Sequence, residues 1–180
     1  PEAPARPRTG KETDMDQMIV EGDPLAEVAP PPRRQWVVFG LGDERFALPV
    51  LNVREVLSEF EIELAPNAPS FVLGLVNLRG EIVTVVDGHA RLDAPRPAEP
   101  GEPRVVVVEA GNDVIGLRVD TVSEVMNLYD SEVGPPPAVG DGERARYIDG
   151  VVARSDGLVF LLDSVALCHD PAAQEEAFSF

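Results

Sequence analysis

Short apolar runs separated by polar turn residues fill the chain from Trp36 onward. Val, Ile, Leu and Phe dominate the runs, and Gly, Asp and Asn interrupt them, which is typical of β-strands joined by tight turns. Several runs are apolar at consecutive positions, as expected for strands buried on both faces in a small barrel. No stretch of about 12 residues or more shows helical periodicity. The pattern predicts an all-β fold with strands near residues 36–41, 45–50, 71–78, 81–87, 104–110, 114–120, 147–153 and 158–163.

The second half of this region repeats the first. Shifted by 69 positions, residues 35–57 overlie residues 104–126 without a gap, and eight of the 22 positions from Trp36 onward are identical. Composition alone would give roughly two identities. After an insertion, a shift of 76 positions brings residues 71–87 onto residues 147–163. The chain thus holds two tandem copies of a unit of roughly 60 residues, each the size of a five-stranded SH3-like or OB-like barrel.

The repeats predict the domain organisation. We expect a first subdomain at about residues 35–100 and a second at about residues 101–170, which together form one domain at 35–170 with short helical segments. Residues 1–34 hold seven prolines and lack sustained periodicity, which is typical of a disordered extension. Residues 171–180 would form a C-terminal tail.

The charge argues against two classes of partner. The formal net charge is -17, whereas a nucleic-acid binder needs a basic surface and an anionic membrane repels an acidic one. The apolar run at 105–108 is far too short to cross a membrane. Cys168 is the single cysteine, which leaves no internal disulfide and fits a reducing compartment. We therefore expect a cytoplasmic protein without nucleic acid or direct membrane insertion, suited to basic protein surfaces.

The polar residues do not form a recognisable catalytic or metal-binding motif. His89 and His169 lie far apart in the sequence, and neither has a second metal ligand at a useful spacing. Phosphate-binding, dinucleotide-binding and nucleophile-elbow motifs are absent from the sequence. Asp87 and Asp163 each end the last strand of a repeat, a position that favours a helix N-cap over a catalytic carboxylate. We expect no enzymatic activity, no cofactor and no metal.

The order and spacing of several segments resemble the CheW family of chemotaxis coupling proteins. The resemblance covers residue 36 to about residue 168. It implies two five-stranded barrels around a shared hydrophobic seam, without catalytic activity. The segments that carry it are FALPVLNVREVL (46–57), APNAP (65–69), GLVNLRGEIVTVVD (74–87), IGLRVDTVSEVM (115–126) and YIDGVVARSDGLVFLLD (147–163).

This resemblance implies a scaffold that couples methyl-accepting chemoreceptors to the histidine kinase CheA in a bacterial chemosensory array. Its partners would be the tip of a receptor's cytoplasmic hairpin and the regulatory domain of CheA, with CheW–CheW or ring contacts in addition. The protein would reach the membrane-associated array through these partners. Gly88-His89-Ala90-Arg91 replaces a segment that usually contains leucine. That departure leaves open a paralogue that positions or tunes arrays for a pilus or biofilm pathway, and a small-barrel ligand-binding module is a further alternative.

The turn before the last strand differs between the repeats and carries the first candidate binding residues. Arg79 and Gly80 stand where the second repeat has Ser155 and Asp156, although either pair satisfies a hairpin turn. Glu55 on the earlier strand is an obvious partner for Arg79. A Glu–Arg pair of this kind has a structural role, or by the resemblance lies beside the receptor-binding groove, and we expect both roles.

Three valines near Glu55 are the remaining candidates for the receptor-binding surface. Val50, Val53 and Val56 follow a spacing of three that fits neither strand alternation nor a long helix. A bulge or a helical turn after Pro49 would rotate some of them outward. The alternatives are that all three are core residues, or that some form an apolar landing site for a receptor helix, as the resemblance implies. No residue is assigned to the kinase.

Overall fold

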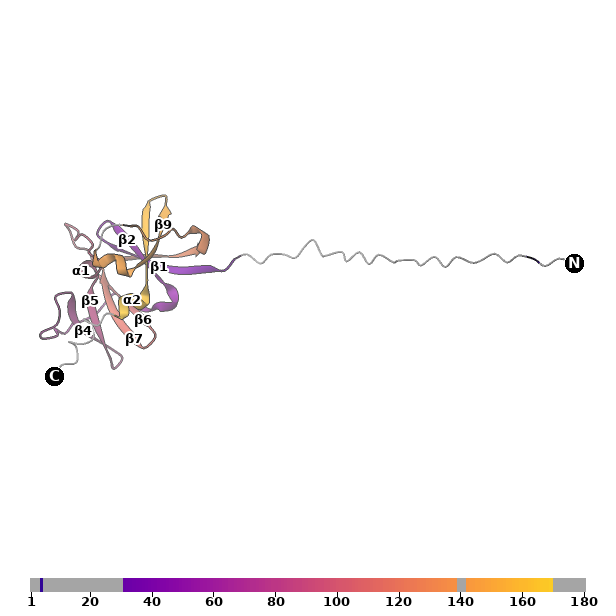
Figure 1. The fold of residues 1–180 in the computed structure, drawn as a ribbon. Helices are drawn as coiled ribbons and strands as arrows, with labels where there is room; N and C mark the ends of the chain where they lie inside the picture. Colours follow the sequence, from indigo (N-terminus) through magenta and orange to yellow (C-terminus); the bar gives the residue numbers. More distant parts are fainter. Residues whose placement is uncertain (1–3, 5–30, 139–141, 170–180) are drawn as a thin grey trace. The chain divides into compact units, whose positions relative to one another are not determined.

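The structure is a computed structural model that describes residue 4, residues 31–138 and residues 142–169 (Figure 1). Residues 1–30 and residues 31–180 are two separate units of the chain. The predicted extension therefore lies largely outside the described residues, as does the tail at 171–180. Strand β1 begins at Arg33, which is earlier than the expected domain start at residue 35.

The two repeats fold into the same series of elements. Each has five strands followed by a short helix, and a shift of 76 positions carries β4 onto β9. The predicted all-β class with short helical segments is confirmed. The elements are β1 (Arg33–Leu41), β2 (Glu44–Pro49), η1 (Val50–Asn52), β3 (Val53–Leu57), β4 (Val72–Leu78), β5 (Glu81–Asp87), α1 (Gly88–Arg91), β6 (Arg104–Ala110), β7 (Asp113–Val119), β8 (Thr121–Tyr129), η2 (Asp130–Glu132), η3 (Glu143–Tyr147), β9 (Ile148–Arg154), β10 (Gly157–Leu162) and α2 (Ser164–Cys168), where η marks a 3₁₀ helix.

Each five-stranded sheet combines strands from both repeats. The strand orders are β8-β1-β2-β10-β9 and β3-β6-β7-β5-β4. The first hairpin of one repeat therefore joins the last three strands of the other, through the parallel pairs β2–β10 and β5–β7. This differs from our expectation that consecutive strands at 35–100 and 101–170 would each build one barrel. The two repeats have the same pattern of apolar residues. The first hairpin of either repeat therefore buries the same strand faces whether it pairs with its own repeat or with the other one.

The core consists of three apolar clusters. One cluster belongs to the sheet that contains β1, a second belongs to the sheet that contains β6, and the largest lies between the two sheets and holds them together. Strand β1 contributes Trp36 and Val38 to the first cluster but Phe39 and Leu41 to the largest, so it is buried on both faces. The shared seam implied by the resemblance is thus present, although the sheets are open at their edge strands and are not closed barrels.

The aspartates that end β5 and β10 cap the two short helices. Asp87 accepts a hydrogen bond from the His89 N–H at 2.9 Å, and Asp163 accepts from the N–H groups of Val165 and Ala166 at 2.9 and 3.1 Å. These bonds satisfy amide groups at the helix starts that have no partner within the helix. The predicted N-cap role of both aspartates is confirmed. Within the described ranges, no helix is long and apolar enough to cross a membrane.

Candidate functional site

The path of the chain from β2 into β3 decides which of the candidate valines face outward. Pro49 is followed by the 3₁₀ turn η1, and β3 carries a bulge at Arg54, because Val53 pairs with Val108 and Glu55 with Val107. The bulge places Val53 and Val56 on the side of the seam, opposite the buried Val108 and Val106. The expected helical turn and bulge are therefore both present.

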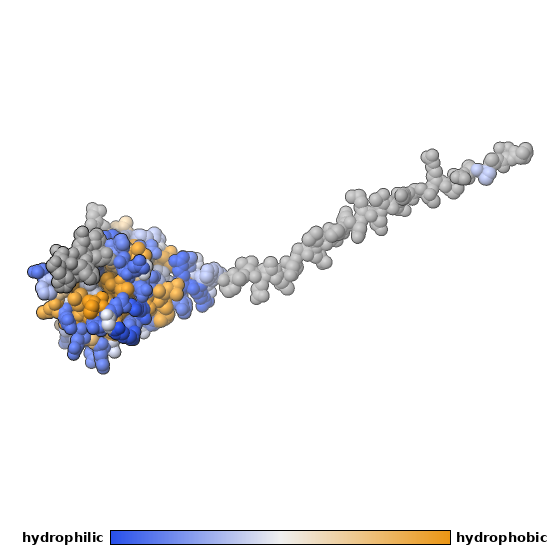
Figure 2. Space-filling view, turned by 90° about the horizontal axis from the view of Figure 1, so that it is seen from below, coloured by the Kyte–Doolittle hydropathy of each residue, from blue (hydrophilic) through white to orange (hydrophobic). Residues whose placement is uncertain are grey.

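The exposed apolar side chains around η1 and β3 form a rim at the edge of the seam. Val50 and Val53 are half-buried, Val53 packs against the seam cluster, and Val56 is 40% exposed. Leu51 at the centre of η1 is 98% exposed. Sequence reasoning missed Leu51, because the helical turn expected after Pro49 does not by itself tell which of its side chains points outward. Figure 2 shows apolar side chains gathered in the middle of one face of the folded region, with hydrophilic side chains around them.

Glu55 and Arg79 form the predicted ion pair in bidentate geometry. The Arg79 Nη1 and Nη2 groups donate to Glu55 Oε1 and Oε2 at 3.1 and 3.2 Å. Because β3 and β4 are opposite edges of their sheet, the pair bridges two edge strands that do not hydrogen-bond to each other. The Arg79 side chain is 81% exposed and that of Glu55 is 22% exposed. The carboxylate of Glu55 thus holds the guanidinium group of Arg79, which is exposed to solvent.

The turn that carries Arg79 has an unusual backbone that its sequence supports. Leu78 pairs with Glu81 across two residues, and the φ angles of Arg79 and Gly80 are 51° and 91°. Positive φ at both central residues is required by the tight hairpin turns that match strand twist. Asn77 Oδ1 accepts a hydrogen bond from the Gly80 N–H at 2.8 Å. This rigid turn fixes where the Arg79 side chain begins.

A second ion pair beside the first was not expected from the sequence. Arg54, at the bulge, contacts Glu81 Oε2 at 2.7 Å and Glu109 Oε2 at 3.8 Å. The hydrogen bond with Glu81 raises the pKa of Arg54 above its usual value. Arg54 therefore links β3 to Glu81 after the β4–β5 turn, and Glu55 links β3 to Arg79 within that turn. The cation comes from β3 in the first pair, whereas the anion comes from β3 in the second.

The second repeat carries an ion pair at the equivalent turn, with the charges reversed. Arg45 on β2 contacts Asp156 at 2.6 Å, and this hydrogen bond raises the pKa of Arg45 and lowers that of Asp156. The sequence comparison suggested that the second repeat closes without an arginine at this place, because Ser155 replaces Arg79. The structure shows instead that Arg45 supplies the cation from another strand. Both repeats therefore use an ion pair at this turn.

The two histidines, which the sequence left without partners, each meet a carboxylate. His89 is 7% exposed, and its Nε2 lies 3.0 Å from both oxygens of Asp120. Burial raises the pKa of Asp120, but hydrogen bonds from the Gly42 N–H and from His89 outweigh it and hold the pKa below the usual value. His169 Nδ1 lies 2.7 Å from Asp113. Among the described residues, no group of three His, Cys, Asp or Glu side chains is arranged to hold a metal ion.

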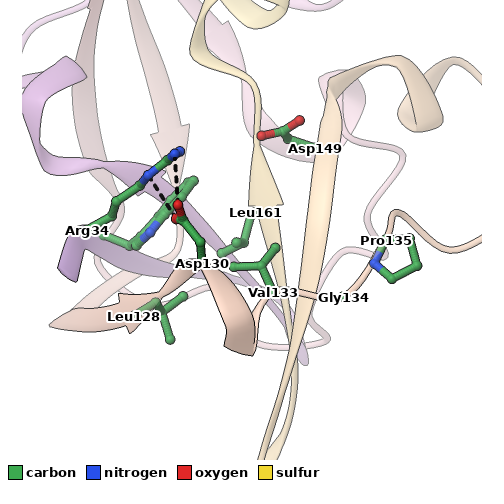
Figure 3. A pocket seen from close by; sticks show the side chains of 9 residues that line it. Arg34, Leu128, Asp130, Val133, Gly134, Pro135, Asp149 and Leu161 are labelled. Atoms are coloured by element: carbon green, nitrogen blue, oxygen red, sulfur yellow. Dashed lines mark hydrogen bonds and ion pairs between the residues drawn. The ribbon is translucent and has the colours of Figure 1, made fainter. Parts of the chain in front are cut away.

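Among the described residues, neither Cys168 nor a hollow on the sheet that contains β1 shows an arrangement of reacting groups. Burial raises the pKa of Cys168 to about 12, so its thiol is unreactive at neutral pH. An open hollow of about 320 Å³ lies on the sheet that contains β1. Figure 3 shows Arg34 and Asp130 paired at one side of it, Asp149 at the other, and Val133 and Leu161 between them. These groups do not converge on one point as an active site requires.

The comparisons with known proteins agree with this architecture. The model of the CheW-like domain matches residues 35–172. Chemotaxis protein CheW of Rhizobium meliloti is 33% identical over 147 residues, which cover 80% of this chain and 92% of the relative. Protein FrzA of Myxococcus xanthus is 34% identical over 131 residues, which cover 69% and 77%. The crystal structure of the scaffolding protein TtCheW from Thermoanaerobacter tengcongensis has a TM-score of 0.70 and 28% identity, and the match covers 78% of this chain and 96% of that one.

The fold and these matches define the class of protein. The chain belongs to the family of CheW-like domains, which confirms the resemblance seen in the sequence. The relatives named above are a chemotaxis protein, protein FrzA and a scaffolding protein, and the family is one of non-catalytic scaffolds.

Proposed function

We propose that this chain is a cytoplasmic adaptor that couples chemoreceptors to the histidine kinase CheA. The receptor would be bound through the tip of its helical hairpin, and the kinase through its regulatory domain. CheW–CheW or ring contacts would extend the assembly into an array. Membership of the CheW-like family and the chemotaxis relatives support this role.

The observation that carries the receptor-binding part is the exposed Glu55–Arg79 pair beside apolar side chains. A helix tip needs an apolar landing site together with polar groups that fix its orientation. Val50, Val53 and Val56 supply the first, with the exposed Leu51 next to them. Glu55 on β3 supplies the second, together with Arg79 and Gly80 on a rigid turn. Arg79 retains donors for a partner because an arginine carries five N–H groups and only two bond Glu55.

A reconstitution with purified components tests the proposed function. The full chain is mixed with a receptor signalling fragment and a CheA-type kinase, and the complex is measured by sedimentation together with kinase autophosphorylation. We expect the chain to be required for the two partners to sediment together. If the receptor fragment and the kinase each fail to bind the chain, the proposal is wrong.

A second candidate is a CheW-like paralogue that serves another pathway, such as pilus or biofilm control. The buried His89–Asp120 contact favours it, because it occupies the segment where the family resemblance leads us to expect leucine. Deleting the gene and comparing swimming with surface movement would separate the two. Loss of surface movement alone would favour the paralogue.

A further inference from the structure

The connection between β3 and β4 carries three carboxylates along one side. Its sequence alternates acidic and apolar residues from Glu59 to Glu63. Phe60 and Ile62 pack against the cluster inside the sheet, whereas Glu59, Glu61 and Glu63 are exposed. Because alternate side chains of an extended segment point the same way, these carboxylates follow one another at intervals of about 7 Å.

These carboxylates have no task in holding the fold together. Within residues 31–138 and 142–169, none of the three makes an ion pair or accepts a hydrogen bond. The isolated β-bridge Glu63–Leu75 in the first repeat corresponds to the β-bridge Gly134–Val151 in the second. This correspondence aligns the connection between β3 and β4 with the connection between β8 and β9. The acidic residues at the places of Glu59 and Glu61 in the second repeat are Asp130 and Glu132, and both have partners within the fold. Asp130 pairs with Arg34 at 3.0 Å, and Glu132 accepts a hydrogen bond from the Tyr129 N–H at 2.7 Å.

A hollow of about 410 Å³ separates this connection from the outer edge of β4. Its apolar lining comes from β3, β4 and the connection, and the carboxylates of the connection line it as well. The lining residues are Leu57, Glu59, Phe60, Glu61, Glu63, Val76, Asn77 and Leu78.

The edge of β4 is open where it faces the hollow. Leu75 exchanges both backbone hydrogen bonds with Glu63, each at 2.8 Å, and that pairing ends there. In an antiparallel hairpin, bonded and non-bonded pairs alternate from the turn, so the pair Leu78–Glu81 is bonded and Asn77–Ile82 is not. The N–H and C=O of Asn77 therefore point away from β5, and no backbone group among the described residues bonds them.

We propose that this hollow binds an extended, basic segment of a partner protein as an added strand on β4. The Asn77 backbone groups would pair with the segment, whose Lys or Arg side chains at alternate positions would meet Glu59 and Glu61. Addition to a sheet edge obtains affinity from main-chain hydrogen bonds and specificity from alternate side chains. The three unpaired carboxylates and the net charge of -17 repel an acidic segment. This surface goes beyond the proposed function, and Arg79 is not among the residues that line it.

Peptides of equal composition test the proposal on the full chain. The probes are acetylated, amidated Arg-Thr-Arg-Thr-Arg-Thr and Arg-Arg-Arg-Thr-Thr-Thr, titrated into ¹⁵N-labelled protein and followed by NMR. We expect the alternating peptide to shift the amide signals of residues 59–63 and of Asn77 in a saturable manner. The block peptide should bind several-fold more weakly, because only two of its three cations can face the carboxylates while the backbone pairs, whereas all three cations of the alternating peptide can.

Matched variants separate this site from general attraction to an acidic protein. Glu59→Gln with Glu61→Gln should weaken the alternating peptide by about five- to tenfold, the loss of two partly screened ion pairs. Asp43→Asn with Asp149→Asn removes two exposed, unpaired carboxylates elsewhere and should leave affinity within about twofold. Equal binding of both peptides, shifts scattered over the surface, or an equal loss in the control variant would overturn the proposal. Melting curves verify that each variant is folded.

Discussion

Arg79 pairs with Glu55, yet its side chain is largely exposed to solvent. A substitution of Arg79 should therefore affect the stability of the fold and the binding of a partner to different extents. An exposed ion pair contributes about 0–1 kcal/mol to folding, whereas a charged side chain central to an interface costs about 2 kcal/mol or more when truncated. Arg79→Ala should therefore weaken binding of a receptor tip fragment by about tenfold or more and leave the melting temperature nearly unchanged. Calorimetric titration beside melting curves measures both. Asp156→Ala, which breaks the equivalent pair in the other repeat, should leave receptor binding intact.

Glu55→Ala should give the same result if the two side chains act as a unit. The double variant would then lose less than the sum of the single losses. Unchanged affinity together with a melting temperature lowered by many degrees would assign the pair to the fold and move the receptor site elsewhere.

The charge of Asp120 gives a residue-scale prediction about pH. Its pKa is lowered in the folded protein, so the ionised carboxylate stabilises the fold above the usual value of about 3.9. That contribution is lost as pH falls through the lower, folded value. Compared with Asp120→Asn, the natural protein should be more stable at about pH 5 and should lose this advantage below about pH 4. Urea unfolding at several pH values measures the difference. A difference independent of pH would contradict the role of the charge.

The sequence predicted the Glu55–Arg79 pair but not the neighbouring Arg54–Glu81 pair. Glu55 and Arg79 stood out because the repeats differ at the turn, whereas Arg54 lies in a bulge whose place depends on pairing with β6. The exposure of Leu51 depends in the same way on how η1 leaves the sheet. Local spacing therefore indicated a bend but not which side chain would be outermost.

At the scale of elements, the eight strands that the sequence located are present, whereas the ranges of β3 and β8 and the partners of all the strands were not predicted. The offset of 76 carries β4 onto β9 and β5 onto β10, as expected. The exchange of hairpins between the repeats was not predictable, because β1 and β6 carry equivalent apolar residues on both faces. Either repeat's hairpin satisfies the same neighbours. Only the three-dimensional path through η1 decides that β3 pairs with β6.

Gly74 marks the bulge that lets β4 meet the acidic connection. Its φ is 147°, and an added Cβ would lie 2.2 Å from the Glu63 carbonyl oxygen and 2.7 Å from Ile62 Cγ2. Gly74→Ala should therefore destabilise the fold by about 2 kcal/mol or more. Gly80→Ala has free space but a φ of 91° and should cost about 1 kcal/mol. Gly101→Ala has neither constraint and should be neutral in urea unfolding. An equal cost at all three positions would contradict this steric account.

At the scale of the molecule, two truncations test at which residue the fold begins. Removing residues 1–30 should change the melting temperature by less than about 2 °C, because a proline-rich sequence with few apolar residues buries little surface. Removing residues 1–34 should cost more. It takes away the Arg34–Asp130 pair and the Arg33 guanidinium, which lies 4.5 Å from the centre of the Tyr129 ring. Differential scanning calorimetry compares the two, and a loss of several degrees on the shorter truncation would show that residues 1–30 dock on the sheets.

The duplication gives the molecule exposed aliphatic side chains at matching places in the two repeats, and we call the set in each repeat its apolar surface. Two such sets would suit an adaptor that engages two partners at once. Val56 and Val125 occupy equivalent positions and are 40% and 53% exposed, and Ile82 and Leu158 are likewise equivalent and 61% and 54% exposed. Because these aliphatic side chains are exposed, they contribute little to either core and are available for contact with a partner.

If the two surfaces serve different partners, substitutions in one should spare the other. Val125→Asp with Leu158→Asp should abolish binding of the kinase regulatory domain, because each places a charge in an apolar contact, while receptor binding persists. Val56→Asp should have the opposite effect, since Val56 lies beside Glu55. Because all three side chains are substantially exposed, the variants should stay folded. Separate calorimetric titrations with the receptor tip fragment and the kinase domain decide. Loss of both partners in either variant would mean that receptor and kinase share one surface, and the duplication would then have no part in coupling them.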